Sequence, residues 1–366
     1  MSMRLSTEVL VIGAGPAGSA AAHWAAKAGH MVVMLEKETM PRERVCGDAL
    51  TPKAVGHLHD MGLSVTCDEF HRHHGLRMTA HGRSIELRWP TDHDHPNHGL
   101  VIRRSRLDQL LLEHTTNTGA QVWTGGEVLD PIIEHGHLRG CRAFGSGNGT
   151  GPHGEIEVRA RFVVIADGPL SPFGRALGTA RTRTYAQGVA MRGYFPSIHH
   201  ADDIIESVFD LRDNTGEQLP GYGWVFPVGD GTVNAGVGLL SHHHGNDPRS
   251  MRELFDQWIC QIPEYWGVAS EDIESEPEGG RLPMGASVRP RSGPNWVVVG
   301  DAAGSVNPFN GDGIEPALSN GRLAATVISD AIHSGDGLEL RQYERQLASK
   351  YDHYYRLGRL ATKALG

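Results

Sequence analysis

Three glycines near the start of the chain have the spacing of a phosphate-binding turn. Gly13, Gly15 and Gly18 lie between an apolar run that ends at Ile12 and an alanine-rich segment. In such a strand-turn-helix, the first glycine permits a tight turn, the second lets the backbone approach a pyrophosphate, and the third lets helix and strand pack closely. Glu36 ends the next apolar run, where a carboxylate can accept the hydroxyl hydrogens of a ribose. The pattern predicts a dinucleotide site, and a glycine-tolerant turn is the alternative.

A second glycine-rich segment follows an apolar strand near residue 300. It reads Gly300-Asp-Ala-Ala-Gly-Ser-Val-Asn-Pro-Phe-Asn-Gly-Asp-Gly-Ile. Asp301 could reach a ribitol, and the amides of the following loop and helix could approach an isoalloxazine ring. One nicotinamide cofactor would need only the first segment, whereas an extended FAD needs separate segments, so the pair points to FAD. The residues expected to shape the loop over the flavin ring are Pro308, Asn310, Gly311, Gly313 and Ile314.

Two further polar residues could contact the same cofactor. Arg104 precedes Asp108 at the expected start of a helix, and its guanidinium could bind the pyrophosphate. A solvated arginine at a helix start is the alternative reading. Asp167 ends the apolar run 162–166, and together with Ala17 and Gly300 it completes the predicted cofactor set.

The chain also carries two groups that could act on a substrate. Cys46-Gly47-Asp48 places a thiol beside a carboxyl, which could donate a proton; a buried apolar cysteine and a turn aspartate are the alternatives. In Tyr222-Gly-Trp224-Val-Phe226-Pro227, strand alternation would put the three rings on one face. Ordinary core packing is the competing interpretation of these rings.

These segments resemble the FAD-dependent aromatic-hydroxylase superfamily and, more specifically, are similar to the geranylgeranyl reductase family. The closer match rests on Cys46-Gly-Asp-Ala-Leu-Thr-Pro and on residues 220–227, which fit that family's P-x-Y-x-W-x-F-P pattern at every fixed position. The similarity extends from Glu8 to about Ala331, and the menaquinone type is the nearest. The positions that the resemblance marks as cofactor-contacting are Gly13, Gly15, Gly18, Glu36, Arg104 and Asp301.

The resemblance implies an FAD enzyme whose reduced flavin saturates carbon-carbon double bonds of a polyprenyl lipid, most of all the side chain of menaquinone. Cys46 or Asp48 would supply the proton, and Tyr222 and Trp224 would stabilise positive charge on a prenyl carbon by ~0.5–2 kcal/mol each. Phe226 and Pro227 would line the hydrocarbon channel. NAD(P)H or a redox protein would reduce the flavin.

Two other functions remain open at this point. An FAD-dependent monooxygenase or halogenase is the competing enzyme, although a halogenase would be expected to carry paired tryptophans where Tyr222 and Trp224 stand, together with a catalytic lysine. A non-catalytic escort protein that binds prenyl groups is the alternative from another class. The cofactor segments and Cys46-Gly47-Asp48 disfavour it.

Composition narrows the class further. The chain has 366 residues and a formal charge of −9, which disfavours a nucleic-acid partner. Four scattered cysteines fit a reducing cytoplasm. We expect no metal at the histidine clusters 71–74, 93–95 and 242–244, because histidines in polar loops are expected to be solvated.

No apolar run suits a signal peptide or a transmembrane helix. A basic C-terminal helix could give peripheral contact with the cytoplasmic face of a membrane, and a charged solvent face is the alternative. The basic residues concerned are Arg341, Arg345, Lys350, Arg356, Arg359 and Lys363.

Apolar periodicity sets the expected architecture. It predicts an α/β protein in which a Rossmann-like FAD-binding domain of the aromatic-hydroxylase type contains an inserted, mostly antiparallel β-sheet substrate domain, followed by C-terminal helices. The FAD-binding domain is expected at 1–75, 100–185 and 285–335, the substrate domain at 76–99 and 186–284, and the helical segment at 336–366. Helices are expected at 16–28, 105–118 and 249–262, and a hairpin at 75–90.

Overall fold

The fold was analysed in a computed structural model, which describes residues 3–65, 69–91, 94–185, 187–213, 215–240 and 248–365. The chain forms two compact units. Unit 1 consists of Met1–Arg42, Ser105–Tyr185 and Pro283–Leu360, and unit 2 of Glu43–Arg104, Ala186–Leu282 and Ala361–Gly366. Residues 43–75, which we grouped with the cofactor domain from the sequence, belong to unit 2. The roles of the predicted domain ranges stay predictions.

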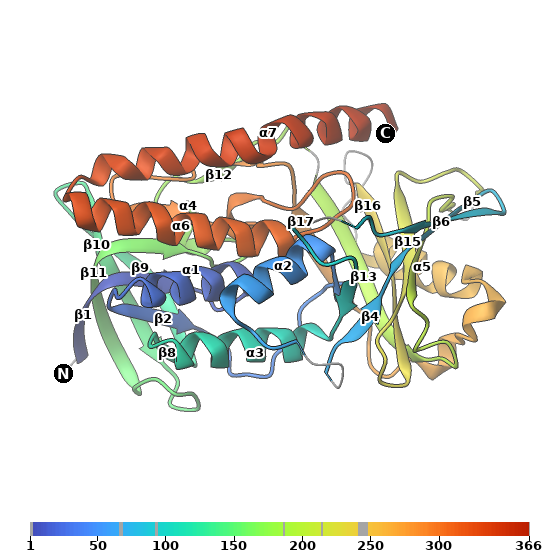
Figure 1. The fold of residues 1–366 in the computed structure, drawn as a ribbon, viewed down its shortest axis with the longest axis horizontal. Helices are drawn as coiled ribbons and strands as arrows, with labels where there is room; N and C mark the ends of the chain where they lie inside the picture. Colours follow the sequence, from blue (N-terminus) through green and yellow to red (C-terminus); the bar gives the residue numbers. More distant parts are fainter. Residues whose placement is uncertain are drawn as a thin grey trace. The chain divides into compact units, whose positions relative to one another are not determined.

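Unit 1 is built on a mainly parallel sheet (Figure 1). The central strand β1 (Met3–Ile12) pairs in parallel with β2 (Val32–Glu36) on one side and β11 (Gly154–Ile165) on the other. Strand β8 (Gln121–Thr124) extends the sheet beyond β2. The other edge of β11 holds antiparallel β10 (His137–Gly145) and parallel β19 (Trp296–Val298), and β9 (Gly126–Glu134) pairs with β10.

Helices of unit 1 complete its core. One apolar cluster joins β1 and β2 to α1 (Pro16–Lys27), α6 (Ile314–Ser334) and α7 (Leu340–Leu365). Small side chains let α1 and α6 approach closely, because a Cβ at Gly321 would lie 2.3 Å from the carbonyl oxygen of Ala17. The remaining elements are α3 (Arg104–Asn117), whose first residue lies in unit 2, α4 (Pro172–Ala176), η3 (Gly300–Ala303), η4 (Gly337–Glu339), β12 (Ala180–Arg181) and β18 (Val288–Arg289).

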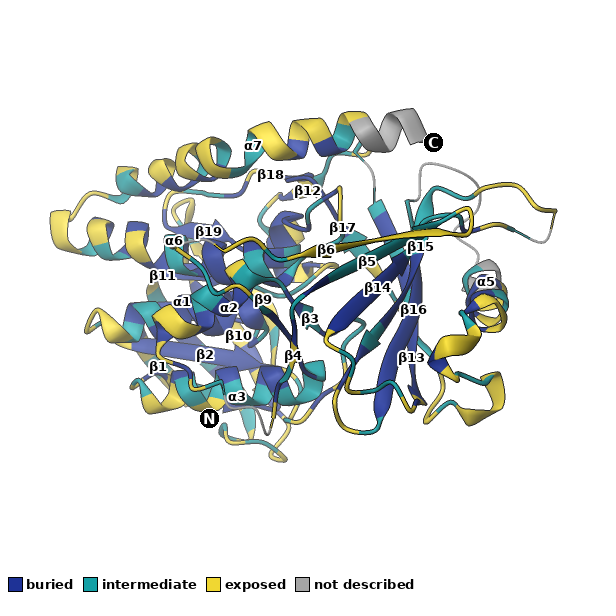
Figure 2. Cartoon of the chain, turned by 45° about the vertical axis from the view of Figure 1, so that its right-hand side comes forward, coloured by how far each residue is buried: buried dark blue, intermediate teal, exposed yellow. Residues whose placement is uncertain are grey.

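Unit 2 contains a seven-stranded, mostly antiparallel sheet, as predicted. Its strands, in spatial order, are β17 (Glu278–Pro283), β13 (Gln187–Pro196), β16 (Thr232–Leu240), β15 (Gly221–Pro227), β14 (Ile204–Val208), β5 (Gly75–Ala80) and β6 (Arg83–Arg88). Figure 2 shows buried central strands and an exposed β6 at the edge. Helix α5 (Pro248–Gln261) packs on one face through Trp258. Smaller elements are α2 (Pro52–Met61), β3 (Ala49–Leu50), β4 (His71–His73), β7 (Gly99–Val101), η1 (Glu264–Trp266) and η2 (Ser270–Asp272).

Local sequence patterns predicted the helices correctly, but the prediction for one histidine cluster was wrong. The three predicted helices are confirmed within one residue at each end as α1, α3 and α5. The hairpin is confirmed as β5 and β6. The prediction of solvated loop histidines was wrong for residues 71–73, because these form β4 and His73 is buried, with its Nε2 near Leu50 O at 3.3 Å. Residues 93 and 242–244 lie outside the described residues.

Candidate active site

In the first glycine turn, two of the three glycines have no space for a side chain and the third has space. Gly13 has φ +99°, and a Cβ there would lie 2.3 Å from Ala166 O; a Cβ at Gly18 would lie 1.9 Å from Gly13 O. Both positions therefore require glycine. A Cβ at Gly15, in contrast, would meet only Arg42 Nη2 at 3.7 Å. The N-cap residue Gly15 makes no side-chain cap hydrogen bond, so there is space beside this turn, and pyrophosphate binding there stays a prediction.

Glu36 is held firmly at the end of β2. Its Oε2 accepts a hydrogen bond from Ala14 N at 2.8 Å, and its Oε1 accepts one from Glu38 N at 3.0 Å. Arg42 Nη1 lies 2.7 Å from Oε1, and its Nη2 donates to Asp108 at 3.2 Å. Arg42 is a site residue that the sequence did not reveal, because nothing in its local pattern sets it apart. Glu36 therefore lies beside the glycine turn, and ribose binding by its carboxylate stays a prediction.

The two glycine-rich segments meet within unit 1. Gly300 begins η3 with φ +61°, and a Cβ there would lie 2.8 Å from Ala17 Cβ. A Cβ at Gly313 would lie 3.8 Å from Asp301 Oδ1, so the predicted ribitol ligand and the start of α6 are neighbours. Segments far apart in the sequence therefore lie side by side in unit 1, as an extended dinucleotide would require.

The loop before α6 supplies a side chain that binds the first backbone N–H groups of that helix. Asp312 Oδ1 accepts hydrogen bonds from Ile314 N at 3.1 Å and Glu315 N at 3.2 Å. Gly311 adopts φ +74°, and Pro308 packs against Gly358 of α7, where a Cβ would lie 2.7 Å from Pro308 Cγ. The first helix amides, which we expected to face the flavin ring, are thus bound by Asp312, and a positioning role for Pro308, Gly311, Gly313 and Ile314 stays a prediction.

Asp167 and Arg104 have different surroundings from those expected. Asp167 accepts hydrogen bonds from Ser171 Oγ at 2.6 Å and Phe173 N at 2.9 Å, so both of its oxygens bind groups of its own loop. Burial raises its pKa. Arg104 lies in unit 2, where its backbone N donates to Asp48 Oδ1 at 3.1 Å, whereas the other predicted cofactor residues belong to unit 1. Cofactor contact by these two residues stays a prediction.

The aromatic strand of unit 2 has the predicted alternation. The rings of Tyr222, Trp224 and Phe226 follow one another along β15, with centroid separations of 6.0 and 6.2 Å. On the opposite face, a Cβ at Gly223 would lie 2.5 Å from the Trp258 ring of α5. The row of three rings therefore faces away from α5, and Pro227 ends the strand.

The Cys46-Gly47-Asp48 turn packs directly on this aromatic row. A Cβ at Gly47 would lie 2.8 Å from Phe226 Cε2 and 3.3 Å from Trp224 Nε1. Cys46 is a half-buried free thiol. Only glycine between Cys46 and Asp48 allows such close contact with the rings, so the predicted proton donors and the predicted hydrocarbon-binding rings do occur together in unit 2.

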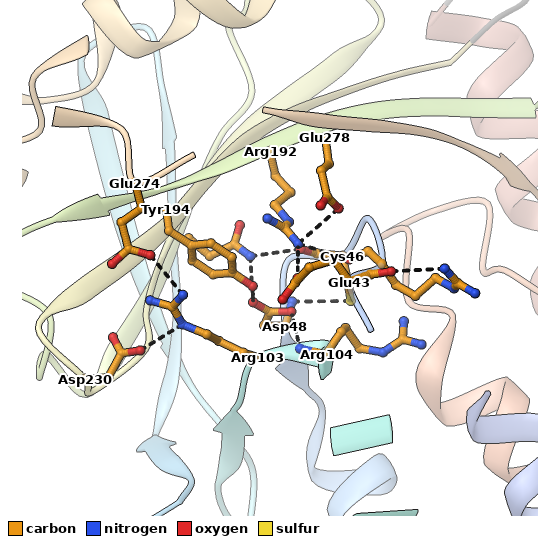
Figure 3. A network of polar contacts seen from close by, with 12 residues as sticks. Glu43, Cys46, Asp48, Arg103, Arg104, Arg192, Tyr194, Asp230, Glu274 and Glu278 are labelled. Atoms are coloured by element: carbon orange, nitrogen blue, oxygen red, sulfur yellow. Dashed lines mark hydrogen bonds and ion pairs between the residues drawn. The ribbon is translucent and has the colours of Figure 1, made fainter. Parts of the chain in front are cut away.

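Asp48 is the centre of a polar network (Figure 3). It is fully buried and has φ +65°, which is uncommon for a residue with a side chain. Its Oδ2 accepts hydrogen bonds from Tyr194 Oη at 2.5 Å and Asn234 Nδ2 at 2.8 Å. Burial raises the pKa of Asp48 to about 6, although these two hydrogen bonds and the charges of Arg192 and Arg104 oppose the shift.

The neighbouring thiol is also held by this network. The backbone N of Asp48 donates to Cys46 Sγ at 3.3 Å, and Asn234 Nδ2 donates to Cys46 O at 2.8 Å. Burial raises the pKa of Cys46; the Arg104 guanidinium lowers it and the Asp48 charge raises it. A thiol in these surroundings keeps its proton at neutral pH, which suits a proton donor.

Tyr194 and Asn234 are network members that the sequence analysis missed. Tyr194 of β13 is the cross-strand partner of Asn234 in β16, which is in turn the partner of Phe226 in β15. Asn234 Oδ1 also accepts a hydrogen bond from Trp224 Nε1 at 2.9 Å. One signal was available, since a buried asparagine in the apolar run 233–237 needs partners for its amide.

Comparisons with known proteins agree with this geometry. The chain matches the family model described as the FAD binding domain over residues 6–350. It is 39% identical over 328 residues to a menaquinone reductase of Mycobacterium tuberculosis, covering 90% of this chain and 78% of the relative. It is 30% identical over 351 residues to a digeranylgeranylglycerophospholipid reductase of Thermoplasma volcanium, covering 94% of this chain and 82% of the relative.

Solved structures show the same fold. A geranylgeranyl bacteriochlorophyll reductase-like protein from Thermoplasma acidophilum matches with a TM-score of 0.85 and 25% identity, covering 99% of this chain and 88% of that chain. A flavin-dependent brominase matches with a TM-score of 0.75 at 19% identity, covering 93% of this chain and 83% of that chain. The second likeness shows the fold alone.

The glycine cradle, the carboxylate of Glu36 and the family match over residues 6–350 define an FAD-binding flavoprotein. The two reductases at 30% identity or more, matched over most of their lengths, locate the chain within that class. It belongs to the geranylgeranyl reductase family of FAD-dependent oxidoreductases. The resemblance drawn from the sequence is therefore confirmed.

Proposed function

We propose that this protein saturates carbon-carbon double bonds of a polyprenyl chain, and that the isoprenoid side chain of menaquinone is its substrate. The observation that carries the proposal is the packing of the Cys46-Gly47-Asp48 turn against Trp224 and Phe226, because an acid group beside an apolar aromatic face suits the protonation of an alkene. The relative named menaquinone reductase, at 39% identity, supports the choice of substrate.

The residues would divide the chemistry as follows. Gly13, Gly15 and Glu36 would hold the phosphates and ribose of FAD. The flavin would supply hydride after its reduction by NAD(P)H or a redox protein. Cys46 gives the proton: its S–H bond breaks, the electron pair stays on sulfur, and a new C–H bond forms on the alkene. The rings of β15 bind the hydrocarbon chain and stabilise positive charge that develops on its carbon.

We propose peripheral contact of α7 with an anionic membrane, where such a substrate would be found. Described helices contain no segment long and apolar enough to cross a bilayer. The second half of α7 exposes Tyr354, Leu357 and Leu360, and Phe309 is 73% exposed beside Gly358. The described side chains that are exposed along α7 include several bases and no acid, which complements anionic lipid. These exposed side chains are Arg341, Gln342, Arg345, Gln346, Ser349, Lys350, His353, Tyr354, Arg356, Leu357 and Leu360.

An anaerobic mass measurement tests the function. Purified protein loaded with FAD is reduced chemically without oxygen and then given menaquinone with an unsaturated side chain. We expect the flavin to be reoxidised and the lipid to gain one H₂. The variant Cys46→Ser should slow this step, whereas Cys260→Ser, which changes an exposed cysteine of unit 2, should not.

Other outcomes identify the competing functions. Gain of one oxygen atom by the lipid, dependent on O₂, would make the protein a monooxygenase. Tight prenyl binding without any flavin would make it an escort protein. Reduction of a geranylgeranyl phospholipid but not of menaquinone would keep the reaction and replace the substrate.

A further inference from the structure

The ring of Tyr194 is fixed by two arginines. Arg103 Cζ lies 4.1 Å and Arg192 Cζ 4.4 Å from the centroid of the Tyr194 ring. Acidic side chains hold both guanidiniums in turn: Arg103 binds Asp230 at 2.8 Å and Glu274 at 2.9 Å, and Arg192 binds Glu43 at 2.8 Å and Glu278 at 3.4 Å. The phenol that donates to Asp48 is therefore packed against two ion-paired arginines (Figure 3).

Asp48 and Cys46 share their surroundings, so the charge of one affects the other. The Asp48 amide binds Cys46 Sγ, and Asn234 Nδ2 donates both to the Asp48 carboxylate and to the Cys46 carbonyl. A thiolate next to an ionised Asp48 is disfavoured by like-charge repulsion. Arg104 is the cation that faces both groups, and Arg192 also faces Asp48. Arg103 lies over the Tyr194 ring, and Glu43 and Glu278 pair with Arg192.

We infer that Tyr194 is a positioning residue for a coupled acid pair: its hydroxyl keeps Asp48 ionised at neutral pH, and the ionised Asp48 keeps the proton on the Cys46 thiol. Tyr194 touches neither cofactor nor substrate in this role. The inference deepens the proposed function, since it rests on that proposal for the use made of the thiol proton. It requires no turnover to test.

The direction of the coupling can be worked out for two variants. Tyr194→Phe removes a hydrogen-bond donor to the Asp48 carboxylate, so the pKa of Asp48 should rise above its value of about 6. More of Asp48 is then neutral at pH 7, and the thiol ionises more readily. Asp48→Asn removes the charge at every pH. Both changes favour the thiolate at pH 7, but only Asp48→Asn does so at pH 9.

Alkylation of Cys46 by iodoacetamide, followed by mass spectrometry of its peptide, measures this effect on the FAD-loaded protein. At pH 7 we expect alkylation about threefold faster in Tyr194→Phe and about fivefold faster in Asp48→Asn than in wild type. At pH 9 Tyr194→Phe should match wild type, and Asp48→Asn should remain faster. If reagent access limits the rate, the ultraviolet absorbance of the thiolate, taken against Cys46→Ser, gives the same titration.

The matched control is Tyr343→Phe, which also removes a buried hydroxyl, one that donates to Val298 O at 2.8 Å in unit 1. It should lose comparable stability and leave Cys46 unchanged. Equal alkylation at pH 7 in Tyr194→Phe and wild type would overturn the inference, as would equal acceleration at pH 7 and pH 9. A protein that passes this test but reduces no prenyl chain would refute the proposed function alone.

Discussion

Ala17 and Gly300 lie so close that a Cβ on Gly300 would be 2.8 Å from Ala17 Cβ. This approach joins the two glycine-rich segments of unit 1 into one cradle. Gly300→Ala should therefore lower the FAD content of the purified protein severalfold, because the added methyl must push the segments apart. Gly335→Ala is the control, since Gly335 has a similar positive φ of +72° but open space around it. Both variants carry the backbone strain of about 1 kcal/mol, and only the first has the clash.

Gly15 should separate folding from cofactor binding. A Cβ at Gly15 would make only an ordinary van der Waals contact, and the backbone has φ −75°. The free energy of unfolding of Gly15→Ala should therefore lie within about 1 kcal/mol of that of wild type. Its methyl would nevertheless occupy the space left for the pyrophosphate, and FAD affinity should fall at least tenfold. Thermal unfolding of the FAD-free protein and fluorescence titration with FAD measure the two effects. An unchanged affinity would place the phosphates elsewhere.

Asp48 should give the protein a distinctive dependence of stability on pH. Its pKa is raised in the folded state to about 6 from 3.8, so the folded state binds this proton more tightly than the unfolded state does. The contribution to the free energy of unfolding is present below pH 4 and is lost as the pH rises through 6, by about 3 kcal/mol at most. Urea unfolding of wild type and Asp48→Asn between pH 4.5 and 7.5 should show this loss in wild type only. Parallel curves would remove Asp48 as its source.

The exposed apolar end of α7 should mediate lipid contact. Leu357→Glu combined with Leu360→Glu should abolish cosedimentation with vesicles that contain anionic lipid, because it adds charge to exposed apolar positions. Leu338→Glu is the control: Leu338 is also exposed, but it lies in η4. Wild type should bind neutral vesicles poorly and lose binding at high salt. Equal binding by all three proteins would exclude this surface.

The cofactor cradle could be predicted because each of its parts is a local pattern. A strand, a glycine turn and an alanine-rich helix are contiguous in the sequence, and Glu36 ends the next strand. Small residues at such positions have few alternative explanations once the strand context is known. The turn at Gly13, Gly15 and Gly18 and the position of Glu36 therefore followed from the sequence, and their contact with a cofactor stays a prediction.

The acid cluster could be predicted only in part. Cys46 and Asp48 stood out by type and by family likeness, but Tyr194 is 146 residues away from Asp48 and Asn234 is 186 residues away. Their pairing depends on strand register, which periodicity alone does not give. Arg42 was missed for the same reason, since its partners Glu36 and Asp108 are fixed by the tertiary fold.

The strand order of unit 1 also determines which strands can pair while the chain is being synthesised. Strand β1 can pair with β2 soon after both have been synthesised, but its second neighbour β11 follows more than a hundred residues later. Strand β19, which pairs with β11, is synthesised later still. The nascent chain must therefore carry an unpaired apolar strand edge through much of its synthesis, which is a state prone to aggregation. The absence of chaperones should consequently reduce the yield of native flavoprotein.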